Sequence, residues 1–504
     1  MVVLPSRRAD RSNPPLVTFY HDIEQDVDSE ASPAVCRQVV SEFLKLEKKY
    51  GVCATYNVVG RLMRDQPDMV EHITEGGHEV AFHSYDHPPQ GAPHSYAQQI
   101  DLCRDVSDAI CGYRSPRSGI DQAAVERLWD KRFLWNAEAD AQHEPYFIHQ
   151  GLVRLPIATD DWPLHRGAVS VEEFVRRFSQ SLRRRHYLAL GFHDSVTSFA
   201  PEARLQAWER LLRIAVDNGA FALTFGEAAD LFRRAALSRY YHQHATAWNR
   251  GTQTFYRTKR FRELIRAEAG QLDRPVIADL GSGGGVLSRP LADIAAAIHC
   301  VDNAPEMLAD VTSSGPLQAH LGEVTDSHLP EHSVDLIICA RVIEYLFWPD
   351  RLADEIKRIG RNGAVYFVTF PASEASAPAN AGPPPDRIRR YFTPEEIRRW
   401  ANRIGPGRLI GVQYVRAEPE NPEAEERYRR MESDPPRDAS PTDWVCIGTV
   451  DGNAPRAQAR TISLAHATFR FPSERSERMK RYLRKLGARC PQPVRRIGKR
   501  MLNR

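Results

Sequence analysis

The sequence lacks long apolar runs and paired cysteine motifs. No stretch of its 504 residues approaches the 18 consecutive apolar residues that a membrane-spanning helix needs. The longest strand-like run is VDLIICARVI. The eight cysteines are scattered, without the CxxC pairs of metal sites. We therefore expect buried or free thiols and no disulfide framework.

A strong charge of either sign is also missing. The formal net charge is +3, because 68 Lys and Arg nearly balance 65 Asp and Glu. The chain as a whole therefore lacks the strong positive charge that is typical of nucleic-acid-binding proteins. The first 20 residues place their charges after a very short apolar start, which is the wrong order for a secretory signal. These features predict a soluble, cytoplasmic protein.

Two series of alternating strand-like and helical segments are present. The first runs from residue 16 to about 235, and the second begins at residue 275 and ends near 450. Repeated alternation of strand and helix is typical of parallel sheets and barrels. We predict an α/β protein with one domain at 1–235, a second at 236–452 and a basic C-terminal tail at 453–504.

Three strand-like runs of the first series end in polar residues. LVTFY is followed by Asp22 and Glu24, HEVAF by His83 and His87, and YLALGF by His193. Residues at the C-terminal ends of parallel strands gather around one pocket. Two histidines spaced four apart point toward one centre if they lie on one face of a helix, and also if they lie in a tight loop that directly follows a strand. Two histidines and a carboxylate form a set that binds Zn, Fe, Co, Ni or Mn.

In chain order, these residues resemble the polysaccharide deacetylase family with its NodB homology domain. The acidic motif is filled by Asp22 and Glu24, and the H-[ST]-x-x-H motif by HSYDH at 83–87. GYRSPRSG supplies Arg114, TDDWP supplies Asp160, Asp161 and Trp162, and LGFHDS supplies His193. The resemblance spans residues 16 to 232 and implies a distorted (β/α)7 barrel.

The resemblance also implies a role for each residue. Glu24, His83 and His87 would hold a divalent metal, zinc first among the candidates, and Asp22 would be the general base. The opposite assignment, with Asp22 as the ligand and Glu24 as the base, is an alternative, because many members of the family have adjacent aspartates here. Arg114 would fix the base through a bidentate contact, His193 would protonate the leaving amine, and Asp160 or Asp161 would orient His193.

The second series opens with a glycine-rich turn between a strand and a helix. VIADLGSGGG places Asp279 before Gly281, Gly283 and Gly285, and Asp302 follows about twenty residues later. An acid at that distance commonly binds ribose, so the pattern alone allows NAD or S-adenosylmethionine. The dinucleotide pattern, however, needs a glycine where this chain has Val286.

The D-x-G-x-G-x-G arrangement resembles motif I of class I S-adenosylmethionine-dependent methyltransferases. The resemblance covers residues 240 to 450 and implies a Rossmann-like, seven-stranded domain. The three glycines would line the cofactor, Asp302 would hold its ribose, Glu323 would lie near its adenine and Asp279 would face its methionine end. Glu344-Tyr345 replaces a frequent Glu-His pair, which leaves a general base for the acceptor unassigned.

The tail has an excess of basic residues. Met479, Tyr482, Leu483 and Leu486 recur at helical spacing among many arginines. This pattern is typical of a basic amphipathic helix on an anionic membrane surface, here the inner membrane, although charge-rich ends are also often solvated and disordered. Nucleic acid is a third alternative, without a recognised fold to support it.

Together these features predict a bifunctional glycan-modifying enzyme. A metal-dependent deacetylase would remove the acyl group of an amino sugar, and the methyltransferase would modify the same or a related acceptor. One alternative is a deformylase or deacetylase of a lipid-linked or nucleotide-linked sugar. Another is a non-catalytic carbohydrate-binding barrel attached to an active methyltransferase.

Overall fold

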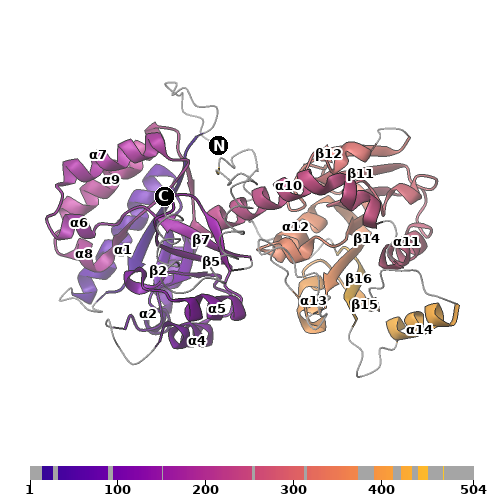
Figure 1. Cartoon of the computed structure of the whole chain (residues 1–504), viewed down its shortest axis with the longest axis horizontal. Coiled ribbons are helices and arrows are strands. Elements are labelled where there is room, and N and C mark those ends of the chain that lie inside the picture. Colours follow the sequence, from indigo (N-terminus) through magenta and orange to yellow (C-terminus); the bar gives the residue numbers. More distant parts are fainter. Residues whose placement is uncertain are drawn as a thin grey trace, which may run out of the picture.

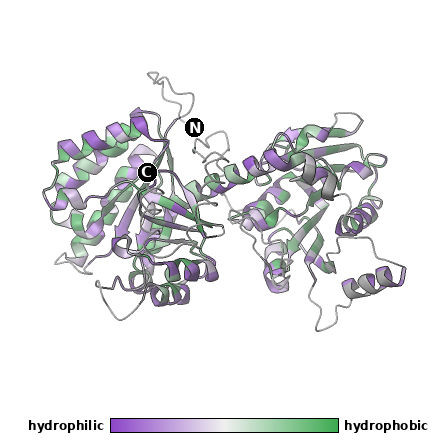
Figure 2. Cartoon of the chain, in the orientation of Figure 1, coloured by the Kyte–Doolittle hydropathy of each residue, from purple (hydrophilic) through white to green (hydrophobic). Residues whose placement is uncertain are grey.

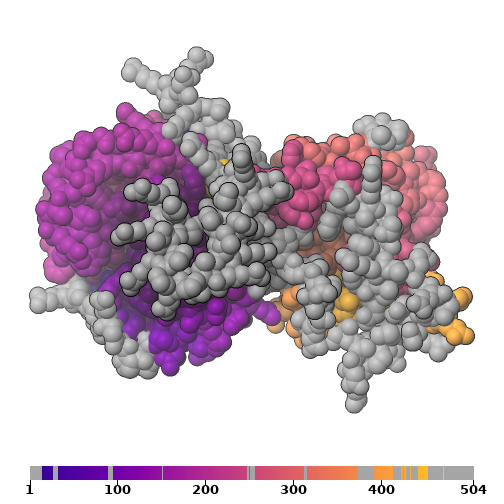
Figure 3. Space-filling model, viewed as in Figure 1, coloured from indigo at the N-terminus to yellow at the C-terminus, as the bar shows by residue number. Residues whose placement is uncertain are grey.

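The computed structural model divides the chain into two α/β units. It describes residues 14–25, 32–88, 95–149, 151–252, 256–311, 315–372, 391–412, 422–433, 441–451 and 469. Figure 1 shows the units joined by the long helix α10 (Phe225–Thr252), and Figure 3 shows them as two lobes of the surface. The predicted α/β class is confirmed.

The N-terminal unit is a curled sheet of mostly parallel strands. Seven parallel strands follow one another in the order β7-β5-β4-β3-β2-β1-β8. A parallel bridge from Thr159, just after β7, to Leu190 on β8 links the two ends of this series. The sheet therefore curls as the predicted distorted (β/α)7 barrel requires. The strands are β1 (Leu16–Ile23), β2 (Thr55–Val58), β3 (Glu79–Phe82), β4 (Gly112–Tyr113), β5 (Trp135–Ala139), β7 (Leu152–Ile157) and β8 (Tyr187–His193), with β6 (Tyr146–His149) antiparallel to β7 and β9 (Phe221–Leu223) parallel to β1.

Helices cover the outside of this barrel. In α1 (Pro33–Tyr50) the buried residues recur at helical spacing, for example Val39, Phe43 and Glu47, and the helix ends at Gly51 in the left-handed conformation. Figure 2 shows hydrophilic and hydrophobic stripes on these outer helices. The others are α2 (Gly60–Asp65), α3 (Pro67–Glu75), α4 (Tyr96–Val106), α5 (Gln122–Asp130), α6 (Trp162–His165), α7 (Val171–Arg184), α8 (Asp194–Ser198) and α9 (Pro201–Asp217).

Large side chains fill the interior of the barrel. Tyr20, Trp135 and Tyr187 are buried there in one apolar cluster, together with Phe225 and Phe232 of α10. A side chain at Gly191 would clash with the Tyr20 ring, since an added Cβ would lie 2.3 Å from its Cε2 atom. The barrel interior is therefore a packed core, and the predicted site residues lie at or just after the C-terminal ends of the strands.

The second unit is a seven-stranded sheet in the order β12-β11-β10-β13-β14-β16-β15. Its first five strands are parallel, and β16 is antiparallel to both of its neighbours. This sheet confirms the predicted seven-stranded Rossmann-like domain. The strands are β10 (Val276–Leu280), β11 (Ala297–Asp302), β12 (Leu317–Leu321), β13 (Val334–Cys339), β14 (Gly360–Pro371), β15 (Gly407–Val412) and β16 (Asp443–Thr449), and the helices are α11 (Tyr256–Ala269), α12 (Pro349–Ile359), α13 (Pro394–Ala401) and α14 (Pro422–Ser433).

Helix α10 crosses the boundary that we predict between residues 235 and 236. Of the predicted tail, only Phe469 lies within the described residues, and its ring contacts Tyr187 and Phe232. The amphipathic pattern of the tail therefore falls outside the described residues. Within the described residues, the structure contains no helix with the length and apolar character to span a bilayer.

Candidate functional sites

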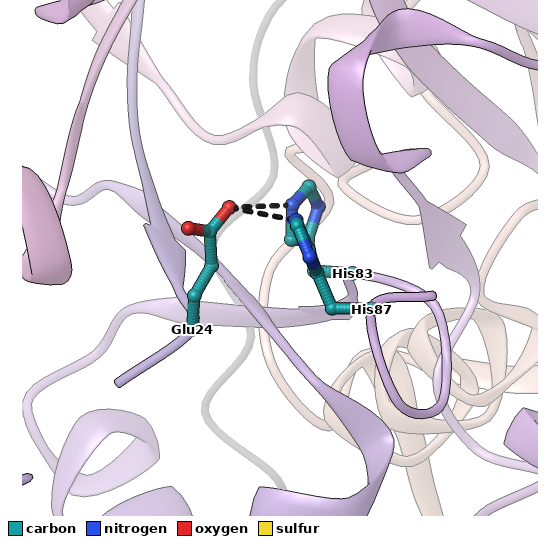
Figure 4. A group of neighbouring side chains, drawn as sticks. All are labelled: Glu24, His83 and His87. Carbon is teal, nitrogen blue, oxygen red and sulfur yellow. Dashed lines mark hydrogen bonds and ion pairs between the residues drawn. The ribbon is translucent and has the colours of Figure 1, made fainter. Parts of the chain in front are cut away.

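Glu24, His83 and His87 converge on one point at the C-terminal ends of the barrel strands. One carboxylate oxygen, Glu24 Oε1, lies 3.1 Å from Nε2 of His83 and 3.1 Å from Nε2 of His87 (Figure 4). All three side chains are buried. Between the histidines the chain makes a tight loop in which Ser84 and His87 have positive φ angles, so the strand-to-loop exit, and not a helix, brings the imidazoles together.

The spacing of these donor atoms fits a metal ion. Two ligand atoms that each lie about 2.1 Å from an ion are separated by about 3.0 Å at a right angle and 3.4 Å at a tetrahedral angle. The observed 3.1 Å separations fall within this range. Asp22, Glu24 and His193 form a second group whose donor atoms lie within 4.8 Å of one another. Glu24 is thus common to both groups, whereas Asp22 lies 3.9 Å from His83 Nδ1.

The protonation states also suit metal binding. Burial raises the pKa of Glu24, but hydrogen bonds from His83 and His87 lower it more, so it lies well below its ordinary value. Burial lowers the pKa of His83 despite the nearby carboxylates. An ionised carboxylate and a neutral imidazole are the forms that bind a divalent cation.

Asp22 is held by two side chains: Arg114, which directly follows β4, and Asn57 of the adjacent strand β2. Arg114 Nε donates to Asp22 Oδ2 at 2.7 Å and to Oδ1 at 3.1 Å, so one nitrogen spans the carboxylate in place of the bidentate fork that we predict. Asn57 Nδ2 donates to Oδ1 at 2.8 Å, a contact that no sequence motif indicates. Burial raises the pKa of Asp22, but Arg114 and the nearby histidines lower it below its ordinary value.

His193 lies between two carboxylates. Its Nε2 atom is 3.3 Å from Asp22 Oδ2, and its Nδ1 atom is 2.7 Å from Asp161 Oδ1. Asp161 is therefore the aspartate that contacts the ring, while the Asp160 carboxylate accepts from the Trp162 backbone. Burial lowers the pKa of His193, but Asp161 and the other carboxylates raise it to about 10. The ring is thus protonated at neutral pH.

Two residues that the motif analysis leaves out fix Glu24. The buried Asp194 carboxylate accepts the backbone N–H of Glu24 at 2.9 Å and that of Gln25 at 3.1 Å, where the chain turns with a φ of 54° at Gln25. Ser195 donates its hydroxyl to Glu24 Oε2 at 3.3 Å, which leaves Oε1 facing the imidazoles. Their only sequence signal is that they follow His193 directly.

The second unit contains a cavity of ≈ 170 Å³ at the glycine-rich turn. Of the predicted cofactor residues, the cavity is lined by Asp279, Gly281, Gly283, Asp302 and Glu323. Gly285 belongs to the turn, where its N–H donates to the Ser282 carbonyl and its φ is 70°. A side chain at Gly281 would clash, because an added Cβ would lie 2.3 Å from Val342 Cγ2.

The acidic residues of this cavity differ in their partners. Asp302 accepts the backbone N–H of Gly283 at 3.0 Å, so it is anchored to the turn. Asp279 is buried, its Oδ2 atom has no hydrogen-bond partner among the described residues, and burial raises its pKa to about 7. A buried acceptor without a partner at the cavity wall suits a cationic or N–H group of a ligand.

Helix α10 also contributes to the cavity, which the sequence analysis does not foresee. Leu237, Tyr241 and Asn249 line it, and Arg234 Nη1 donates to Glu323 Oε1 at 2.8 Å. Tyr345 also lines the cavity, with its ring centre 6.5 Å from that of Tyr241, and Glu344 beside it is buried with one oxygen 3.2 Å from Arg341. No spacing pattern could assign the α10 residues, because they precede Asp279 by thirty or more positions.

Comparison with known proteins supports both resemblances. Residues 26–122 match the family model of polysaccharide deacetylases, and residues 278–368 match that of a methyltransferase domain. The first match includes His83, His87 and Arg114 and begins after Glu24. The second includes Asp279, Asp302 and Glu323.

Individual relatives match parts of the chain. The chain is 30% identical to the mitochondrial ubiquinone biosynthesis O-methyltransferase of Schizosaccharomyces pombe over 103 residues. The matched segment covers 19% of this chain and 37% of that protein. A putative polysaccharide deacetylase structure from Mycobacterium smegmatis is 19% identical, with a TM-score of 0.37, covering 45% of the chain and 93% of that structure. A putative methyltransferase structure from Haloferax volcanii, complexed with the Trm112 activator, is 18% identical, with a TM-score of 0.32, covering 41% of the chain and 97% of that structure. The chain therefore combines a segment that matches the polysaccharide deacetylase family, at residues 26–122, with a segment that matches a methyltransferase domain, at residues 278–368.

Proposed function

We propose that this protein is a bifunctional enzyme that deacetylates an amino sugar of a glycan in a metal-dependent reaction and methylates the same or a related acceptor. The observation that carries the hydrolytic half is the convergence of Glu24, His83 and His87 beside two ion-paired residues, Asp22 and His193. The family match of this domain supports the amino-sugar substrate.

Each residue of the site has a place in amide hydrolysis. A divalent ion held by Glu24, His83 and His87 would polarise the amide carbonyl and acidify water. Asp22, which Arg114 keeps ionised and oriented, accepts the proton of the attacking water. Protonated His193 donates the Nε2 proton to the leaving amine, while Asp161 accepts a hydrogen bond from Nδ1–H and holds the ring. The Glu24 carboxylate, which faces both imidazoles, supports the assignment of Glu24 as ligand and Asp22 as base.

The methyl donor would be S-adenosylmethionine in the cavity of the second domain. Asp302, fixed to the glycine turn, is suited to accept hydroxyl groups of the ribose, and Glu323, which lines the same cavity, would lie near the adenine. The Asp279 oxygen that lacks a partner is suited to the amino group at the methionine end. The acceptor atom would be a hydroxyl, amine or carboxylate of the sugar.

Two alternatives to this proposal follow from the sequence. One is action on a lipid-linked or nucleotide-linked sugar at the inner membrane, and the other is a non-catalytic barrel that presents sugars to the methyltransferase. The buried, ion-paired pairs Asp22–Arg114 and His193–Asp161 favour catalysis, because a binding module has no need to keep an ionised base beside a protonated acid.

Mass spectrometry of N-acetylated sugar acceptors tests the two activities separately. With wild-type protein and a divalent metal we expect the loss of one acetyl group, and with S-adenosylmethionine we expect the gain of one methyl group. The double variant His83→Ala/His87→Ala should lose the bound metal and deacetylation but keep methylation. The control His72→Ala changes an exposed histidine of α3 and should keep both activities. A metal-free wild-type protein that binds sugars without hydrolysing them would support the binding module instead.

A further inference from the structure

The first turn of α10 is fixed to the barrel by hydrogen bonds. The backbone N–H of Phe225 donates to Thr55 Oγ1 at 2.8 Å, and that of Gly226 donates to Glu79 Oε2 at 2.8 Å. Thr55, Glu79 and Trp135 stand at the starts of β2, β3 and β5, at the end that we call the barrel floor. Trp135 Nε1 also donates to Glu79, at 3.1 Å. The free N–H groups of a helix start thus find their acceptors on the barrel.

The same helix continues into the cavity of the methyltransferase domain. Arg234 Nη1 contacts Glu323, and Asn249 Oδ1 accepts the backbone N–H of Gly284 in the glycine turn at 3.2 Å. Leu237 and Tyr241, between these two positions, line the cavity. A single helix therefore begins on the barrel floor and ends as a wall of the cofactor cavity (Figure 1).

A second connection runs through the loop between β13 and α12. The buried Arg233 donates from Nη2 to the Tyr345 carbonyl at 2.5 Å, and its guanidinium lies 4.1 Å from the centre of the Phe347 ring. Tyr345 lines the cavity, whereas Phe347 belongs to the apolar cluster that fills the barrel. The loop that closes one side of the cavity is thus packed against the other domain.

We propose that the barrel is a structural part of the methyl-donor site: its floor positions α10 and the 345–348 loop, so cofactor affinity in the second domain depends on contacts made in the first. Arg233 and Glu79 are positioning residues in this scheme and do not touch the cofactor. The proposal rests on the proposed function of the cavity as a methyl-donor site.

Titration calorimetry of the full chain with S-adenosylhomocysteine tests this proposal. Arg233→Met keeps the length of the side chain but removes the donor and the charge, and we expect cofactor binding about tenfold weaker. Arg233→Lys keeps a cationic donor and should recover part of the loss, which a general folding defect would not predict. The control Arg213→Met removes an exposed arginine of α9 and should leave binding unchanged.

Hydrogen exchange of the wild-type protein gives a measurement that needs no variant. We expect S-adenosylhomocysteine to slow exchange at the backbone amides of Phe225 and Gly226, which touch the barrel and lie outside the cavity lining. Protection that stops within the methyltransferase domain, or unchanged affinity in Arg233→Met, overturns the proposal. Failure of the wild-type protein to bind the compound would instead reject the methyl-donor function on which the proposal rests.

Discussion

At the scale of single residues, the proposed metal ligand Glu24 is held in place by a neighbouring carboxylate, that of Asp194. Asp194 accepts two consecutive backbone N–H groups at the turn after Glu24, and the φ of 54° at Gln25 is one that few residues adopt without support. We predict that Asp194→Asn, which has one acceptor oxygen fewer, weakens divalent metal binding by about tenfold. Calorimetric titration with Zn²⁺ measures this effect. Asp68→Asn, at an exposed site on α3, is the matched control, and equal affinities in the two variants would contradict the prediction.

The ion pair between His193 and Asp161 leads to a second prediction at the scale of residues. Its folded-state pKa of about 10 lies above the ordinary 6.5, chiefly because Asp161 outweighs the effect of burial. The protonated donor form is present below this pKa and is lost as the pH rises through it. In Asp161→Asn we expect the alkaline limb of the kcat/KM profile for deacetylation to move to lower pH. If the maximum of kcat/KM falls in the variant while the alkaline limb stays at the pH of the wild type, Asp161 does not act through the proton of His193.

The residues of the catalytic site differ in how far the sequence predicts them. Asp22, His83, Arg114 and His193 follow strands in a recognisable order, so their convergence is predictable from parallel topology. Asn57 and Asp194 are not, because their contacts with Asp22 and Glu24 join positions 35 and 170 residues apart without any local pattern. The choice between Asp160 and Asp161 also needs coordinates, since both follow the same strand.

At the scale of elements, the attachment of α10 to the barrel depends on the half-buried Glu79. Burial raises the pKa of Glu79 to about 7, although hydrogen bonds from Gly226, Thr55 and Trp135 lower it. Between pH 4.5 and 7 the folded state therefore holds a proton that the unfolded state releases, so this group makes the protein less stable as the pH rises. The effect amounts to at most about 3 kcal/mol of unfolding free energy.

Glu79→Gln should remove this pH dependence. We predict that its unfolding free energy, measured by urea denaturation, changes less between pH 5 and 7 than that of the wild type. The amide has one acceptor oxygen for three donors, so the variant should be less stable than the wild type at pH 5. A wild-type curve that rises across this interval while the variant curve stays flat would reject the assigned direction.

The sequence does not reveal α10 as one helix, and the reason is physical. Its first turns, including Ala228, Leu231 and Phe232, are buried in the apolar cluster of the barrel, whereas its later turns line the cavity of the second domain. No single apolar stripe runs along the whole helix, so periodicity places a boundary at 235/236 inside it. The strands β1, β8, β10 and β13, which are buried along nearly their whole length, are predictable from their apolar runs.

At the scale of the whole molecule, the two candidate sites are associated with different ends of the barrel. The candidate metal-binding group lies at the C-terminal ends of the strands, whereas α10 and Phe347, which lead to the second cavity, cover the barrel floor, where the strands begin. Tyr20, Trp135 and Tyr187 fill the space between. A sugar cannot pass through the barrel from one site to the other.

Because the barrel interior is closed, we expect a shared acceptor to leave the first site and reach the second through solvent. We predict that an equimolar mixture of His83→Ala/His87→Ala protein and Asp302→Ala protein forms the deacetylated and methylated product as fast as wild-type protein, when the concentration of each working site is equal. Both reactions should show the same lag, because in each the intermediate accumulates before its second modification. Mass spectrometry over time measures the lag and the rate. Product without a lag in the wild type, together with a slower mixture, would show direct transfer along the surface and would require a path that connects the two ends of the barrel.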